Sequence, residues 1–256
     1  MEKQNWNKMD KILQVKEVSK TFGGVKAVDS CSFEVRRGTI TALIGPNGSG
    51  KSTLFNIISG VMNADSGKII FEGNDITNRS PEDISNLGIS RMFQQSRLFK
   101  NLTVRDNLLL AIDNEDMKLW KNVLGKNKIT KEKENRVKEM LKLIGMEEFE
   151  HKTARNLSFG QKRLVELART ILNPHTLLML DEPIAGVNPR LRKTIAKILL
   201  KSKKEGKTVL LIEHDMNFIL GISDEVIVLD EGKVIARGTP KEIKNNPKVL
   251  EAYLGE

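Results

Sequence analysis

The sequence of 256 residues is poor in cysteine, in aromatic residues and in long apolar runs. Its single cysteine, Cys31, excludes an internal disulfide. The longest apolar runs, 176–180 and 208–212, have the length of a β-strand, whereas a membrane-spanning helix needs about 20 residues. The first residues contain no apolar stretch typical of a secretory signal, so we expect the chain to remain in the cytoplasm.

Positive charge is in excess but is not concentrated in one segment. The net charge of +9, from 42 basic and 33 acidic residues, is compatible with nucleic acid or an anionic membrane surface as a partner. However, lysine and glutamate are interleaved along 131–139, as on a solvated helix face. Aromatic residues make up 5% of the chain and do not alternate with basic ones. We therefore expect no nucleic-acid partner.

The pattern of apolar residues divides the chain into three parts. Strand-like runs at 12–15, 31–35, 40–44 and 68–71 surround a helical pattern at 51–59. From about 80 to 172 the periodicity is helical, and 113–131 reads as a loop or a short helix. Strands alternate with helices again from 176 to 229. The predicted fold is therefore α/β, with a mainly parallel sheet, an antiparallel β region near the N-terminus and an inserted helical subdomain.

A glycine-rich loop between the strand 40–44 and the helix 51–59 carries the strongest chemical signal. It matches G-x-x-x-x-G-K-[ST], the motif of a phosphate-binding loop. Its glycines let backbone N–H groups surround phosphate oxygens, while Lys51 reaches the β- and γ-phosphates and Ser52 offers a hydroxyl to Mg²⁺. The predicted nucleotide-binding residues here are Gly45, Pro46, Asn47, Gly48, Ser49, Gly50, Lys51, Ser52 and Thr53.

Two adjacent carboxylates end the predicted strand 176–181. Taken alone, an acidic pair at a strand end is often only a turn. Combined with the phosphate-binding loop, Asp181 is predicted to hold Mg²⁺ and Glu182 to deprotonate an attacking water.

Residues 157–161, Leu-Ser-Phe-Gly-Gln, open a helix with a capping box between Ser158 and Gln161. Lying between the two motifs above, this segment resembles the signature of the ATP-binding cassette (ABC) family, with Phe159 in place of the commoner glycine. The resemblance implies a P-loop NTPase (RecA-like) core with ATP and Mg²⁺ as cofactors. It also implies a head-to-tail, ATP-dependent dimer with a second ABC ATPase subunit, in which Ser158, Gly160 and Gln161 cover the partner's γ-phosphate.

Further positions match the family residue by residue. Phe22 stands where an aromatic ring stacks on adenine, with a core phenylalanine as the alternative. Gln94 resembles the catalytic Q-loop glutamine that touches Mg²⁺ or water, and we prefer it to Gln95 because it follows the strand directly. His214 occupies the switch position that bonds the γ-phosphate. Asn188 departs from the usual aspartate of the D-loop.

Four segments, 91–99, 181–189, 212–216 and 247–255, resemble the ATPase subunits of branched-chain amino acid importers. This likeness implies integral membrane permease subunits as partners, an indirect link to a solute-binding protein, and a peripheral place on the cytoplasmic side of the inner membrane. Alternatives are an importer ATPase for another solute and a soluble cassette ATPase.

The expected organisation is a single ABC ATPase domain. Residues 12–93 and 173–238 would form the nucleotide-binding core, 94–172 the helical subdomain with the signature, and 239–256 a helical tail. A groove beside Gln94 is expected to receive a permease helix, with Phe93, Leu98 and Phe99 as apolar anchors.

Overall fold

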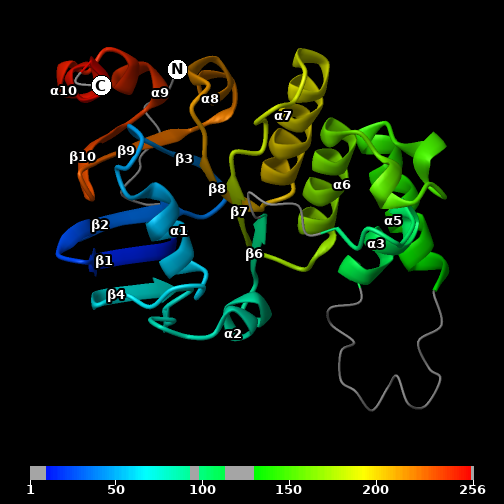
Figure 1. Ribbon diagram of the computed structural model, residues 1–256, viewed down its shortest axis with the longest axis horizontal. Coiled ribbons are helices and arrows are strands. Elements are labelled where there is room, and N and C mark those ends of the chain that lie inside the picture. The colour runs from blue at the N-terminus through cyan, green and yellow to red at the C-terminus, as the bar shows by residue number, and fades with distance from the viewer. Residues whose placement is uncertain (1–9, 93–97, 113–129, 255–256) are drawn as a thin grey trace.

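The computed structural model describes residues 10–92, 98–112 and 130–254, which form two sheets and several helices (Figure 1). The larger sheet has six strands in the order β10-β9-β3-β8-β7-β6. All neighbouring pairs in this sheet are parallel except β9 and β10. Its strands are β3 (Ile40–Ile44), β6 (Ile89–Met92), β7 (Leu177–Asp181), β8 (Thr208–Ile212), β9 (Glu225–Asp230) and β10 (Lys233–Gly238).

Both faces of the six-stranded sheet are covered. Successive side chains of a strand point to opposite faces, so Leu178 and Leu180 of β7 enter one core while Leu177 and Met179 enter the other. The strands β3, β7 and β8 are buried along their whole length. This double burial explains why they read as continuous apolar runs in the sequence.

The smaller sheet is antiparallel, in the order β2-β1-β4-β5. Its strands are β1 (Lys11–Phe22), β2 (Val25–Arg36), β4 (Ser66–Phe71) and β5 (Asn74–Asp75). β1 and β2 have 12 residues each and pair through several register shifts. The predicted runs 12–15 and 31–35 were therefore too short, because β-bulges interrupt the apolar alternation that marks a strand.

Helix α1 (Lys51–Ile58) lies against one face of the large sheet and buries Leu54, Phe55, Ile57 and Ile58 in the core shared with the small sheet. An ion-pair cluster also joins the two sheets. Arg36 of β2 and Arg237 of β10 both bind Glu225 of β9, at 2.8 and 2.6 Å from its Oε1 atom. The small sheet is thus joined through β2 to β9 and β10 of the large sheet.

Among the described residues, five further helices surround the sheets, of which 216–222 had not been predicted. They are α2 (Pro81–Asn86), α7 (Pro189–Lys204), α8 (Met216–Ile222), α9 (Pro240–Lys244) and α10 (Pro247–Leu254). Ser80 and Thr239 cap α2 and α9, their side chains accepting from the N–H groups of Asp83 and Glu242. Within the described ranges, no helix is long and apolar enough to cross a membrane.

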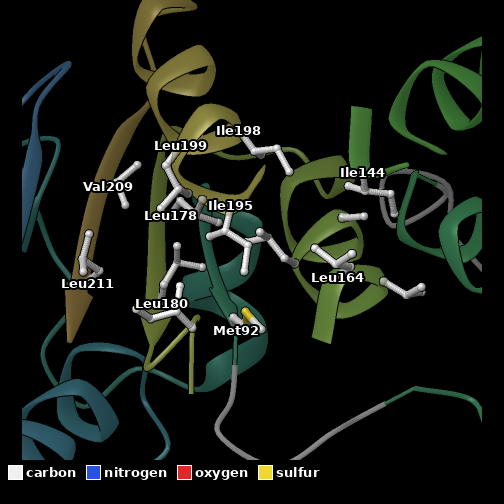
Figure 2. Close-up of a cluster of buried hydrophobic side chains, with 14 of the residues drawn as sticks. Met92, Ile144, Leu164, Leu178, Leu180, Ile195, Ile198, Leu199, Val209 and Leu211 are labelled. Carbon is white, nitrogen blue, oxygen red and sulfur yellow. The ribbon is translucent and has the colours of Figure 1, made fainter. Parts of the chain in front are cut away.

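We call α3 (Val104–Ile112), α5 (Lys131–Ile144) and α6 (Phe159–Leu172) the helical group. They lie together at one side of the large sheet, with the 3₁₀ turns Glu147–Phe149 and Ala154–Asn156 between α5 and α6 (Figure 1). One apolar cluster connects Ile144 and Leu164 of this group, through Ile195 and Ile198 of α7, to the sheet (Figure 2). The predicted α/β fold with an inserted helical part is therefore confirmed.

Candidate active site

The predicted phosphate-binding loop, 45–50, connects the end of β3 to the start of α1. Two of its glycines are required by sterics as well as by conformation. A Cβ atom on Gly45 would lie 1.9 Å from the Leu229 carbonyl oxygen, and one on Gly50 would lie 2.1 Å from that of Ala27. Both residues also have positive φ angles, 151° and 97°. The loop conformation therefore depends on glycine at both ends.

Lys51 is buried inside the curve of this loop. Its Nζ atom donates to the carbonyl oxygens of Gly45 and Pro46, at 2.8 and 2.6 Å, and lies 3.3 Å from Ser49 Oγ. Ser52 is exposed and Thr53 is half-buried in the first turn of α1. A positive charge and a hydroxyl are therefore held beside the N-terminus of α1, an arrangement suited to phosphate.

A pocket of about 200 Å³ opens beside the loop. It joins the loop to two residues from other strands, Glu182 after β7 and His214 after β8. Because β3, β8 and β7 are parallel neighbours, their carboxyl ends meet at one edge of the sheet. The lining consists of Ala27, Asn47, Gly48, Gly50, Lys51, Ser52, Thr53, Glu182, Ile212 and His214.

Glu182 and His214 are directly paired within this pocket. His214 Nε2 lies 3.0 Å from Glu182 Oε1, and both side chains are partly exposed. The backbone of Glu182 has a φ angle of 48°, a left-handed conformation that is uncommon outside glycine. Its N–H donates to the Ile212 carbonyl at 3.0 Å, which ties this residue to the end of β8. The arrangement presents a carboxylate, oriented by an imidazole, to the pocket.

Asp181, the last residue of β7, is buried beside this pair. Burial raises the pKa of its carboxyl above the ordinary value, while Arg91, with Nη2 at 3.7 Å from Oδ2, opposes that rise. Mg²⁺ prefers oxygen ligands, and a cation would favour the ionised carboxylate. The carboxylate of Asp181 and the hydroxyl of Ser52 therefore fit Mg²⁺ in their chemistry.

The structure places Phe22 at the end of β1, where its ring is 45% exposed. The Lys20 ammonium lies 5.7 Å from the ring centroid. Phe22 is therefore not the core phenylalanine that was the alternative interpretation, although it lies outside the lining of the pocket. Gln94, its rival Gln95 and Phe93 lie outside the described residues.

The predicted signature residues lie on the helical group and not in the pocket. Ser158 Oγ accepts from the Gln161 N–H at 3.3 Å, and Gln161 Oε1 accepts from the Ser158 N–H at 2.9 Å, so the predicted capping box is confirmed. A Cβ atom on Gly160 would lie 3.1 Å from Leu191 of α7. Asn188 caps α7 by accepting from the Leu191 N–H at 3.0 Å. The D-loop asparagine therefore has a local structural role that aspartate could also fill.

The sequence analysis missed residues at this site, among them Ala27, Arg91 and Arg163. Ala27 reaches the pocket because β2 passes beside α1. Arg91 was read only as part of a subfamily segment, yet its guanidinium contacts Asp181. Arg163 of α6 donates to the backbone carbonyls of Asp181 and Glu182. No sequence signal marked them, because each contact depends on which elements become neighbours.

Comparison with known proteins identifies the family. A family model described as "ABC transporter" matches residues 28–185. The chain belongs to the ABC transporter family. As a cassette of that family, it is an ATP-binding protein and an ATPase. A second model, "Branched-chain amino acid ATP-binding cassette transporter", matches residues 233–256 of the cassette.

Curated relatives resemble the cassette over nearly its whole length. A probable branched-chain amino acid transport ATP-binding protein LivG from Archaeoglobus fulgidus is 43% identical over 96% of both chains. The high-affinity branched-chain amino acid transport ATP-binding protein LivG of Escherichia coli K12 is 37% identical over 96% of this chain and 98% of that protein. The recognition of the family from the segment 157–161 and the two phosphate-site motifs is thus confirmed.

Solved structures agree with the fold. A nucleotide-free ATP-binding cassette from an ABC transporter superposes with a TM-score of 0.81 at 39% identity, over 96% of this chain and 100% of that chain. A cassette of an ABC transporter in its ADP conformation gives a TM-score of 0.81 at 38% identity over the same shares.

Proposed function

We propose that the cassette hydrolyses ATP to power the uptake of branched-chain amino acids through separate membrane-spanning permease subunits. The observation that carries the hydrolytic role is the pairing of Glu182 with His214 in the pocket lined by the phosphate-binding loop. The solute is proposed from the names of relatives that cover 96% of the chain. The site and the relatives of the cassette together support this function, because a fold alone does not determine function.

In this proposal the loop N–H groups and Lys51 bind the phosphates, and Glu182 accepts a proton from the attacking water. His214 orients the Glu182 carboxylate and offers a hydrogen bond to the γ-phosphate. Ser52 and Asp181, with Gln94, would hold Mg²⁺, which neutralises phosphate charge when bound. Phe22, exposed at the end of β1, would stack on the adenine.

We further propose a head-to-tail dimer formed with ATP. Its support is the separation of the signature residues Ser158, Gly160 and Gln161 from the pocket of their own chain. The N-terminus of α6 would then offer N–H groups to the γ-phosphate held by the other subunit, which is either a second copy or a paralogue. Glu182→Gln with ATP should shift from monomer to dimer in sedimentation, and Ser158→Arg should reverse that shift. A monomer at high protein and ATP concentrations would contradict the dimer.

The cassette is proposed to lie on the cytoplasmic face of the cell membrane, where residues 94–172 contact the permease and 12–93 with 173–238 hold the nucleotide. Leu98, expected as an anchor for the permease, is only 7% exposed and packs in the core, so it is not available for docking. Phe99 is 51% exposed, with the Arg169 guanidinium 5.2 Å from its ring centroid. Phe99 is therefore the preferred anchor among the described residues.

The test combines hydrolysis with transport. Glu182→Gln should bind ATP normally while its turnover falls by about 10²–10⁴-fold, the usual contribution of a general base. Membrane vesicles containing the cassette and its permease subunits should take up leucine, isoleucine or valine with ATP, and the variant should not support this uptake. Near-normal turnover of the variant would contradict the role of Glu182. If the vesicles transport only an unrelated solute with ATP, the proposed solute is wrong but the proposed role in ATP-driven transport stands.

A further inference from the structure

Glu213 is a buried carboxylate that the proposed chemistry does not use. It follows β8 directly and is 3% exposed. Its Oε1 atom accepts from the Ile184 N–H at 3.0 Å, and its Oε2 atom accepts from the His214 N–H at 3.1 Å. The Glu213 carboxylate therefore bridges two loops, the one after β7 and the one after β8.

These two loops carry the paired side chains of the active site. Ile184 lies two residues after Glu182, and His214 follows Glu213 directly. The positive φ angle of Glu182 is a conformation that persists only where the surroundings hold it. A single side chain that bonds both loops is suited to fix the separation between Glu182 and His214.

Arg163 of α6 bonds the backbone of the same segment through its carbonyl oxygens. It is 4% exposed, and its Nη2 atom donates to the carbonyl oxygens of Asp181 and Glu182 at 2.7 and 2.6 Å. Arg163 belongs to α6, two residues after the signature residue Gln161. The backbone around Glu182 is thus bonded through carbonyls to α6 and through the Ile184 N–H to Glu213.

The electrostatics of the site explain why a carboxylate is tolerated here. Burial raises the pKa of Glu213, whereas the N–H groups of Ile184, His214 and Asp215 oppose that rise. Burial lowers the pKa of Arg163, while the nearby carboxylates, Glu166 first and Glu213 among them, oppose that fall. Buried charges usually persist only where they are hydrogen-bonded or paired: Glu213 accepts from backbone N–H groups, and Arg163 Nη1 lies 3.7 Å from Glu166 Oε2.

We propose that Glu213 and Arg163 are positioning residues that together fix the backbone of Glu182 and so hold its carboxylate against His214. The inference rests on the proposed role of Glu182 in hydrolysis. It also gives the signature helix a path to the catalytic carboxylate of its own chain, because Arg163 joins α6 to the end of β7.

The variant Glu213→Gln tests whether the Glu213 carboxylate must bond both loops. Glutamine has the same length but only one acceptor oxygen, so its NH₂ group would face one of the two N–H donors and that bond would be lost. We expect kcat for ATP hydrolysis to fall by about 10- to 100-fold, while KM for ATP changes by less than about threefold. Glu205→Gln, at the exposed end of α7, is the matched control and should keep wild-type kcat.

A double-mutant cycle separates positioning from a general loss of structure. If Glu213 acts through the Glu182–His214 pair, Glu213→Gln should cost little more once His214→Ala has removed the pair. The combined variant should therefore have nearly the kcat of His214→Ala. Fully additive losses, or an unchanged kcat for Glu213→Gln, would overturn the proposal.

Arg163→Lys provides the second measurement, in case Glu213→Gln does not fold by circular dichroism. Lysine keeps the charge, but its side chain is shorter and its ammonium should not reach the position from which Nη2 bonds both carbonyls, so kcat should fall with ATP binding retained. A normal kcat in Arg163→Lys would refute the proposed positioning role of Arg163. If Glu182→Gln loses turnover while Glu213→Gln and Arg163→Lys keep it, only the positioning role of Glu213 and Arg163 is refuted. If Glu182→Gln retains turnover, the role of Glu182 in hydrolysis is itself refuted.

Discussion

The carboxyl edge of the large sheet and the helical group are built by opposite means. At the sheet edge, ionisable side chains such as Lys51, Asp181 and Glu213 are buried. In the helical group, α5 buries Val137 and Leu141 on one side and keeps its lysines and glutamates largely outside. Buried charge is concentrated at the carboxyl edge and at Arg163 and its ion-pair partner Glu166 on α6, where Arg163 bonds the end of β7, while Glu225 is buried in its own ion-pair cluster between the two sheets.

Asn107, one of the buried polar residues of the helical group, shows how a neutral polar side chain is accommodated there. Asn107 is fully buried on α3, but its amide oxygen accepts from the Phe99 N–H at 2.9 Å and its amide nitrogen donates to the Phe99 and Thr103 carbonyls. Its amide oxygen and both of its N–H groups are thus bonded to nearby backbone. In contrast, Asp181 keeps a raised pKa, so its ionised form is incompletely compensated. Incomplete compensation suits a group that is to meet a cation.

The largest difference should appear between two lysines. Lys51→Ala removes the buried ammonium of the phosphate-binding loop and should weaken ATP binding by about 10²–10⁴-fold, because the phosphates would lose a cationic hydrogen-bond donor. Lys142→Ala, on the exposed side of α5, should leave binding unchanged. Equilibrium binding of a fluorescent ATP analogue measures both. Equal ATP affinities in the two variants would show that the buried lysine contributes no more to ATP binding than the exposed one.

Two arginines should differ in the free energy of unfolding. Arg91→Met leaves the buried Asp181 without its ion-pair partner and should cost about 4 kcal/mol. Arg105→Met, in the helical group, removes a partly exposed pair with Glu134 at 2.9 Å and should cost about 0–1 kcal/mol. Urea denaturation gives both values. Similar costs for both variants would mean that the sheet edge is not electrostatically distinct.

Apolar packing should dominate the helical group. Leu141→Ala deletes a buried side chain of α5 and should lower the free energy of unfolding by about 3 kcal/mol, without changing KM for ATP. Leu110→Ala, at an exposed position of α3, is the control and should have little effect. Thermal unfolding and steady-state hydrolysis test this separation of stability from binding. A large change in KM would show that the two regions are tightly coupled.

The smallest expected effect concerns pH and His175, which lies between the helical group and the sheet. Burial lowers the pKa of His175 below its ordinary value near 6.5, so the unfolded chain binds a proton more readily than the folded one. The contribution of His175 to the free energy of unfolding is therefore present above pH 6.5 and is lost progressively as the pH falls below that value.

Urea denaturation at pH 7.5 and 5.5 measures this contribution. His175→Gln should flatten the difference between the two pH values, whereas His151→Gln, at an exposed position, should preserve it. An unchanged pH dependence in His175→Gln would assign the effect to other groups.

Local chemistry made many elements predictable from the sequence. The helix start at Ser158 was recognised because a capping box bonds only residues of its own first turn. Conversely, β1 and β2 were underestimated, because bulges depend on the partner strand. Leu98 was misjudged as a docking anchor, because its burial is decided by the helices packed around it.

By itself, the sequence determined the phosphate-binding loop, the carboxylate pair at 181–182, the capped signature helix and the family, since each depends on residues a few positions apart. Only the tertiary structure decided that Glu182 and His214 lie 3.0 Å apart, and that Glu213 and Arg163 hold the backbone between them. The physical reason is that strand order brings the ends of β3, β8 and β7 to one edge of the sheet. Long-range pairing of that kind is set by the packing of the whole domain and is not encoded in any local pattern.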